Sequence, residues 1–214
     1  MKIAPSAPSL MQRRAARLPW VLLLLAGCSG GLKSNLPPAQ VYVLQPTIAA
    51  PAAPARSSGT VQVMLPLAAP GLAGDGIVVL HPGQRLDYYS AARWAAAAPI
   101  VLQTLAIEAL RASNRFAMVE SDAGPFAAEY VLSLELRHFE AEYRDSGPPT
   151  VHVSLIATLG RRGTRDAVVS FTADSEVRAE ADRMQAVVAA FERATADALS
   201  QLAANAALPA AAQP

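Results

Sequence analysis

Residues 130–143, YVLSLELRHFEAEY, alternate between apolar and polar side chains. Successive side chains of a β-strand point to opposite faces, so Leu132, Leu134 and Leu136 share one face of this segment. The residues between the leucines are polar. We therefore expect a long strand with one buried face and one face in water.

The two segments that follow carry the same alternation. TVHVSLIATLG (150–160) places a valine, leucine or alanine at every second position. RRGTRD (161–166) is a polar turn, and AVVSFTADSEV (167–177) is expected to return as the partner strand. Together the three segments predict neighbouring antiparallel strands.

Shorter strands are predicted from clusters of β-branched and aromatic residues bounded by turn signals. They cover 40–44, 60–67 (stopped by Pro66), 76–81, 84–89 and 115–120. The strand at 84–89 is expected to pair back onto 76–81 through the turn at His81-Pro82-Gly83-Gln84.

Two segments have the apolar spacing of helices. The first begins within 95–99 and ends near Ser113, with Pro99 in the first turn, where its missing N–H costs nothing. The second covers about 181–204. The economical packing is an α+β two-layer sandwich, in which an antiparallel sheet carries both long helices on one face.

The chain has one cysteine, Cys28, so neither a disulfide nor a redox pair can form within it. Arg13, Arg14 and Arg17 precede a short apolar run, and small residues stand just before the cysteine. This is the anatomy of an export signal, too short in its apolar part to span a bilayer. Leu25-Ala26-Gly27-Cys28 resembles the lipobox of bacterial lipoproteins, which implies that Cys28 is acylated and becomes the mature N-terminus.

The composition then predicts the domain organisation. Residues 1–27 are expected to be a signal peptide and 28–39 a lipidated flexible tether. A single domain covers 40–206, with a poorly ordered loop rich in alanine and proline at 45–59, and 207–214 form a disordered tail. Cleavage removes four basic residues and no acidic one, so the mature chain is acidic and lacks a field that would attract nucleic acid.

No catalytic residues, cofactor or metal site are predicted. His138 and His152 are expected to be neighbours across a hairpin on the wet face, without an acidic ligand cluster beside them. Glu135, Glu140 and Glu142 are assigned to the same solvated face. Phosphate-binding and nucleophile-elbow motifs are absent from the sequence, so we expect no enzyme.

Four short motifs occur in a recognisable order. They are Tyr42-Val43-Leu44, Leu65-Pro66, Ile77-Val78 and an aromatic cassette of Tyr88, Tyr89, Arg93, Trp94 and Ala95 before the first helix. Their order and spacing resemble those of the ABC-type transport auxiliary lipoprotein family over about 40–206. The chain departs from the family pattern in its longer loop at 45–59 and in lacking an acidic residue after the tryptophan.

The resemblance implies an outer-membrane-anchored periplasmic lipoprotein that works with an ABC-type lipid transport system. Its partner would be a mammalian-cell-entry (MCE) domain protein that bridges the envelope, and a homo-oligomer is a further expectation. Ser29 is not the aspartate that signals inner-membrane retention in such lipoproteins, which favours the outer membrane. Alternatives are a periplasmic lipid-binding module and an assembly lipoprotein for an outer-membrane protein.

The aromatic residues of the motifs have two interpretations. Tyr42, Tyr88, Tyr89 and Trp94 can bury large areas and use one hydrogen bond each in the fold. They can also serve as anchors for a partner, a role in which tyrosine and tryptophan are favoured.

Overall fold

The computed structural model describes residues 38–48, 59–164 and 166–206. The predicted signal peptide, almost all of the tether, most of the loop at 45–59 and the predicted tail lie outside the described residues. The strands are β1 (Gln40–Tyr42), β2 (Thr60–Val63), β3 (Leu67–Ala68), β4 (Gly76–His81), β5 (Arg85–Trp94), β6 (Met118–Ser121), β7 (Tyr130–Glu142), β8 (Thr150–Arg161) and β9 (Ala167–Arg178). The helices are α2 (Ala98–Ala112) and α3 (Met184–Asn205).

The three longest strands form the antiparallel meander that the alternation predicts. β7 pairs with β8 along its whole length, and β8 pairs with β9. Leu132, Leu134 and Leu136 are buried, while Ser133 and Glu135 between them are exposed. The predicted period of two therefore holds over this part of β7.

The other edge of β7 departs from expectation. It pairs with β2, β3 and β4 in turn, and all three pairings are parallel. The registers Val61↔Tyr130, Leu67↔Glu135 and Val78↔Glu140 show that residues 60–81 follow β7 from its start to its end. The expectation of an antiparallel sheet is therefore wrong for this half, and the sheet is mixed.

Proline explains why this edge is built from short pieces. The expected single strand at 60–67 is divided into β2 and β3, with Pro66 immediately before β3. A proline has no N–H to donate to a ladder, so the pairing with β7 cannot run through that position unbroken. β4 then forms an antiparallel hairpin with β5, as predicted, and β1 adds to β5 in parallel.

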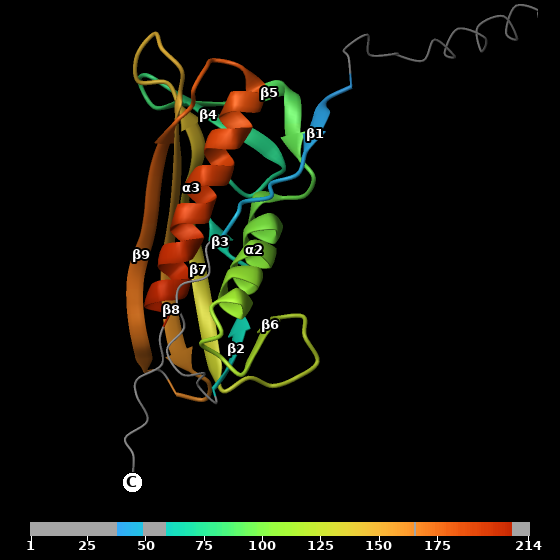
Figure 1. Ribbon diagram of the computed structural model, residues 1–214, viewed down its shortest axis with the longest axis vertical. Coiled ribbons are helices and arrows are strands. Elements are labelled where there is room, and N and C mark those ends of the chain that lie inside the picture. Colours follow the sequence, from blue (N-terminus) through green and yellow to red (C-terminus); the bar gives the residue numbers. More distant parts are fainter. Residues whose placement is uncertain (1–37, 49–58, 165, 207–214) are drawn as a thin grey trace, which may run out of the picture. The chain divides into compact units, whose positions relative to one another are not determined.

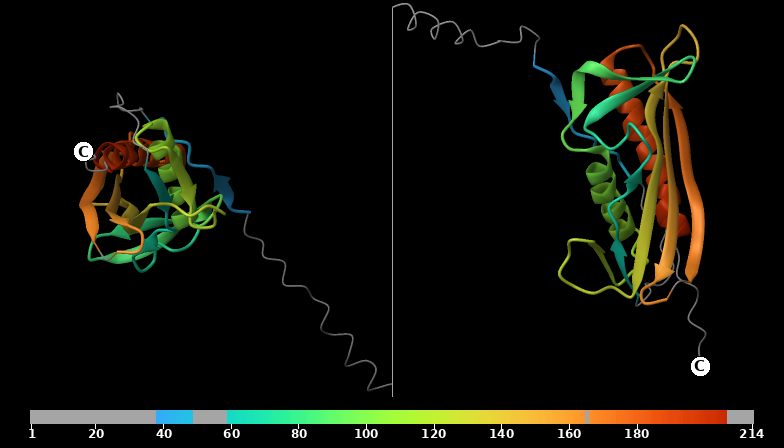
Figure 2. Two further views of the ribbon diagram at one scale, coloured as in Figure 1. Left: turned by 90° about the horizontal axis from the view of Figure 1, so that it is seen from below. Right: turned by 180° about the vertical axis from the view of Figure 1, so that it is seen from behind.

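Both helices pack on one face of the sheet, which the two views of Figure 2 show together with Figure 1. α3 covers β8 and β9, whereas α2 lies against α3, β6 and β2. Pro99 stands in the first turn of α2 as expected. The α+β class with two long helices is thus confirmed, and none of the described helices is long and apolar enough to cross a membrane.

Candidate functional site

Trp94 lies in the core between the sheet and α3. Its indole ring is 5.7 Å from the ring of Phe139 on β7 and 5.1 Å from the ring of Phe191 on α3, measured between centroids. The residue is 2% exposed. Trp94 therefore joins both layers, and its place inside the fold gives it no surface for a partner.

The two neighbouring tyrosines of β5 point to opposite faces, as consecutive strand residues must. The Tyr88 hydroxyl donates a hydrogen bond to the carbonyl oxygen of Gly71 at 3.0 Å, and its ring covers Gly76. Tyr88 is 47% exposed. It holds the loop before β4 against β5 while leaving one side of its ring in water.

Tyr89 belongs to a chain of polar groups at the end of β7. Its hydroxyl lies 3.1 Å from that of Tyr143, which donates to Oδ1 of Asp182 at 2.6 Å. Burial raises the pKa of the Tyr143 phenol far above its ordinary value, and the hydrogen bonds to Asp182 and Tyr89 add to this effect. The chain links β5 and the end of β7 to the segment before α3 with neutral hydroxyl donors.

Tyr42 lines a groove of about 420 Å³ between the segment 42–46 and the first three turns of α2. The carbonyl oxygen of Tyr42 accepts a hydrogen bond from the backbone N–H of Ala95 at 2.9 Å. This bond fixes one wall of the groove. The lining from α2 consists of Ile100, Val101, Thr104, Leu105 and Glu108.

The rim of the groove carries exposed aliphatic side chains. Val43 is 58% exposed and Ile100 is 50% exposed, and both line the groove. Leu44, in the middle of the segment 42–46, is buried and anchors this segment on the core. A concave apolar surface with a few polar groups is the common form of a binding site.

The sequence motifs include Tyr42 but no residue from the α2 side of this groove. Ile100 could have indicated that side, because it is a large apolar residue outside the buried stripe of the same helix. That stripe consists of Leu102, Leu105 and Leu110. The four motif aromatics do not converge in the structure: one lies in the core, two hold β5, and one lines the groove.

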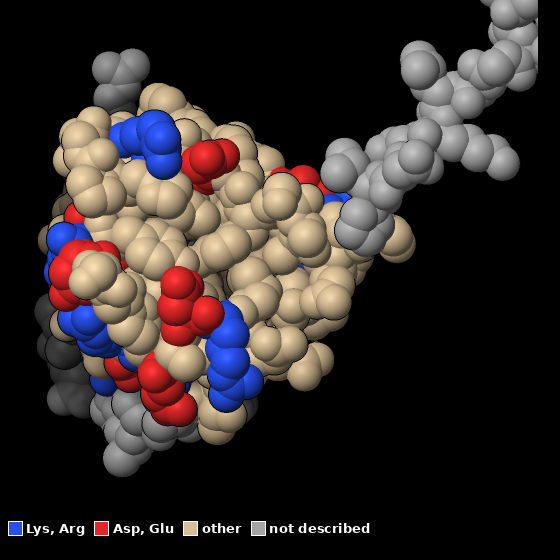
Figure 3. All heavy atoms as spheres, turned by 90° about the horizontal axis from the view of Figure 1, so that it is seen from above, with Lys and Arg blue, Asp and Glu red and all other residues tan. Residues whose placement is uncertain are grey.

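Charges of both signs lie side by side on the face of the molecule shown in Figure 3. In the described part of the chain, ion pairs join charges of opposite sign, for example Arg144 to Glu176 at 2.8 Å and Arg178 to Asp145 at 3.1 Å. The electrostatic fields of neighbouring opposite charges largely cancel at a distance from the surface. The described residues on this face therefore form no broad patch of one sign.

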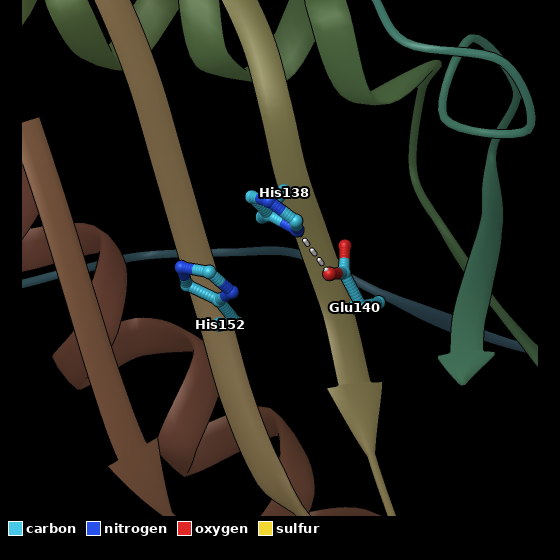
Figure 4. A group of neighbouring side chains, drawn as sticks. All are labelled: His138, Glu140 and His152. Atoms are coloured by element: carbon cyan, nitrogen blue, oxygen red, sulfur yellow. Dashed lines mark hydrogen bonds and ion pairs between the residues drawn. The ribbon is translucent and has the colours of Figure 1, made fainter. Parts of the chain in front are cut away.

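The histidines correct one expectation. His138 and His152 are neighbours on the sheet, with ring centroids 4.1 Å apart and planes inclined by 13° (Figure 4). Acidic side chains do accompany them, because His138 contacts Glu140 at 2.6 Å and His152 contacts Asp174 at 2.9 Å. Glu140 is buried at 6% exposure, so its assignment to a solvated face is wrong.

The comparisons with known proteins identify the family. The model for the ABC-type transport auxiliary lipoprotein component matches residues 42–203. The chain belongs to this family. The auxiliary lipoprotein motifs at Tyr42 and in the aromatic cassette lie within the matched region, and no curated protein matches the chain.

Solved structures agree with this assignment. Protein XCC0632 from Xanthomonas campestris, of family DUF330, is 26% identical, with a TM-score of 0.71 over 77% of this auxiliary lipoprotein and 93% of that chain. An uncharacterized protein has 15% identity and a TM-score of 0.61 over 78% and 98% of the two chains, which shows a shared fold. The PelC dodecamer from Paraburkholderia phytofirmans is 20% identical with a TM-score of 0.43 over 70% and 90%, too loose a match to inform assembly here.

Proposed function

We propose that this protein is the outer-membrane auxiliary lipoprotein of an ABC-type lipid transport system. In this role it is lipidated at Cys28, faces the periplasm and docks an envelope-spanning MCE-domain protein. The observation that carries the proposal is membership of the auxiliary lipoprotein family over 42–203, together with a lipobox ending at Cys28. Phospholipids or other hydrophobic molecules would pass between the membranes at the docked assembly.

The groove beside α2 is the surface that we assign to docking. Its rim exposes Val43 and Ile100, and apolar side chains that remain in water are typical of a partner interface. Thr104 and Glu108 continue the exposed line of α2 along the groove. Such a mixture of aliphatic and polar residues suits a transient interface, in which the partner binds and dissociates while the lipoprotein stays folded.

Crosslinking in cells tests this role. The exported protein is crosslinked, purified through a tag, and the captured proteins are identified by mass spectrometry. We expect an MCE-domain protein encoded with an ABC transporter. Reproducible capture of an outer-membrane protein with no MCE-domain protein would instead support the assembly lipoprotein.

A pair of variants tests the groove. Ile100→Glu places a charge in the groove and should reduce capture at least several-fold, because a carboxylate must be desolvated to enter an apolar contact. Leu67→Glu is the matched control, since Leu67 is 72% exposed on β3 and does not line the groove. Equal loss of capture in both variants, or in neither, would remove the groove from the proposal.

The same groove supports a second candidate function, a lipid-binding module. Its volume of about 420 Å³ and its largely aliphatic lining suit a segment of an acyl chain. Organic extraction of the purified protein followed by lipid mass spectrometry would detect it. Stoichiometric phospholipid that is lost in Ile100→Glu would favour lipid binding over docking.

A further inference from the structure

A β-bulge in β7 brings three possible metal ligands to one point of the sheet. The register between β7 and β8 shifts between Leu136 and His138. Leu136 and Phe139 both point into the core, so His138 and Glu140 both lie on the face away from the helices. Bulges often re-aim side chains at functional sites, and this one turns His138 and Glu140 onto the face of the sheet that carries His152.

The third member comes from the neighbouring strand. His152 on β8 is directly opposite Glu140 in the ladder. One ligand atom from each of His138, Glu140 and His152 lies within 4.8 Å of the others. Figure 4 shows the two imidazoles side by side, with the carboxylate of Glu140 next to His138.

Glu140 has the contacts of an oriented ligand. Its side chain is 8% exposed, and its Oε2 accepts a hydrogen bond from the backbone N–H of Phe139 at 2.6 Å. Its Oε1 lies 2.6 Å from Nδ1 of His138. Among the described residues this buried carboxylate contacts His138 but no lysine or arginine, and buried charges in proteins are paired or bind a metal.

A second layer orients His152. Its Nε2 contacts Oδ1 of Asp174 on β9 at 2.9 Å, so Nδ1, which lies 3.9 Å from Oε1 of Glu176, is the nitrogen that would act as a ligand. A carboxylate on the other ring nitrogen is the usual support of a metal-bound histidine. The surroundings are acidic, because Glu176 also lies near His152. Among the described residues, the arginine that pairs with Glu176 is Arg144, which Glu176 shares with Glu142.

We propose that His138, Glu140 and His152 bind Zn²⁺ on the outer face of the sheet, with Asp174 as the supporting carboxylate. Two imidazoles and one carboxylate form a common zinc ligand set, with the fourth position open to water. Ligands about 2.0–2.2 Å from tetrahedral zinc stand roughly 3.3–3.6 Å apart. Nδ1 of His138 and Oε1 of Glu140 lie 2.6 Å apart in the structure, so zinc binding requires the His138 side chain, which is 46% exposed, to turn away from Glu140. The ion would crosslink β7 and β8 through ligands from both strands.

The proposal predicts one zinc ion per chain. The full-length protein, purified from membranes in detergent and stripped with a chelator, is titrated with ZnCl₂ by calorimetry. We expect saturable binding with a stoichiometry of one and a higher thermal midpoint, whereas MgCl₂ gives neither, because Mg²⁺ prefers oxygen ligands. X-ray absorption at the zinc edge should show nitrogen and oxygen neighbours without sulfur.

Variants separate the ligands from other histidines. His138→Ala and His152→Ala should weaken binding by more than about 100-fold, and Asp174→Asn by about 10–100-fold, as for other supporting residues. His81→Ala should bind like wild type, because His81 stacks on Tyr143 outside this group. Cys28→Ala, purified from the soluble fraction because it lacks the lipid anchor, should also bind normally, since the proposed site uses no thiol.

Either of two results would overturn the site. One is the absence of saturable zinc binding in wild type. The other is undiminished binding in the double variant His138→Ala/His152→Ala, with the fold verified by circular dichroism. If Glu140→Gln fails to fold, His138→Ala still decides the outcome, because the His138 side chain is 46% exposed.

Discussion

Asp122 joins two elements that are distant in the sequence. Its Oδ1 accepts a hydrogen bond from Nε2 of Gln103 on α2 at 2.8 Å, and its Oδ2 accepts one from the backbone N–H of Leu65 at 3.3 Å. The same amide of Gln103 donates to the carbonyl oxygen of Val63 at 3.0 Å. The start of α2 is thereby tied to the chain just beyond β2.

We predict that Asp122→Asn lowers stability at neutral pH but not in acid. The hydrogen bond from Gln103 is the largest cause that holds the pKa of Asp122 below its ordinary value, while burial acts in the opposite direction. A carboxyl with a lowered folded-state pKa stabilises above its unfolded pKa, near 3.9, and this contribution is lost as the pH falls through the folded pKa.

Thermal unfolding followed by circular dichroism at pH 7 and near pH 3 checks this. The midpoint of Asp122→Asn should lie a few degrees below wild type at pH 7, and the gap should narrow in acid. Asp166→Asn, at an exposed aspartate of the β8–β9 turn, is the control and should track wild type. A gap of constant size at both pH values would show that the charge of Asp122 is not responsible.

At the scale of elements, close approach of backbone and ring shapes the β4–β5 hairpin. The register shifts between Gly76 and Val78, and the ring of Tyr88 lies over Gly76. A Cβ atom at Gly76 would stand 2.6 Å from Cδ1 of Tyr88. Position 76 therefore requires glycine, because the ring of Tyr88 occupies the space that a side chain would need.

We predict that Gly76→Ala destabilises the protein by about 1–3 kcal/mol, the usual cost of forcing an extra carbon into a packed site. The ring of Tyr88 must move, which strains its hydrogen bond to Gly71. Urea unfolding followed by tryptophan fluorescence gives the free energy. In a Tyr88→Ala background the cost should fall, because the obstructing ring is gone.

Gly74→Ala is the matched control from the same loop. A Cβ there would meet only the backbone nitrogen of Gly76 at 3.9 Å, an ordinary contact. It should therefore change stability little. Equal effects of the two substitutions would mean that loss of glycine flexibility, and not the contact with Tyr88, governs this loop.

For the whole molecule, the proposed anchor predicts where the protein resides. Cys28→Ala should leave the domain folded but release it from the membrane, because no acyl chain can then be attached. Two or more chains hold a protein firmly, since each buried CH₂ contributes about 0.8 kcal/mol. Fractionation of cells with immunoblotting measures the distribution.

Ser29→Asp is the companion variant. In bacterial lipoproteins, an aspartate directly after the lipobox cysteine signals retention at the inner membrane. Ser29→Asp should therefore stay membrane-bound but move from the outer-membrane to the inner-membrane fraction of a density gradient. Cys28→Ala protein that remained in the membrane fraction after signal cleavage would contradict the proposed anchoring.

Much of the secondary structure was predictable because its signals are local. The alternation in 130–143 and the helical stripe around Leu102 each depend on neighbours within a few residues. The structure has β7 at Tyr130–Glu142 and α2 at Ala98–Ala112, close to expectation. The aromatic cassette likewise stood out by its order, and the family match includes it.

The pairings of β7 could not be predicted in the same way. Its second edge is occupied by three short parallel strands, and direction of pairing depends on how the loops around Pro66 and Pro70 route the chain. The groove beside α2 also needs residues 42–46 laid against Ile100, a contact between distant segments. Periodicity carries no information about such contacts.

By itself the sequence determined both helices, most of the strands, the α+β class and the family, because each is written in residues that stand close together. Lipidation at Cys28 stays a prediction. Only the tertiary structure decided that Trp94 is core, that Tyr42 lines a groove, and that Glu140 is buried beside His138 and His152. Trp94 and Tyr42 are positioned by contacts with segments distant in the sequence. Glu140 lies opposite His152 because of the bulge after Leu136. This bulge changes which face each later residue of β7 occupies, and only the register of the folded sheet reveals it.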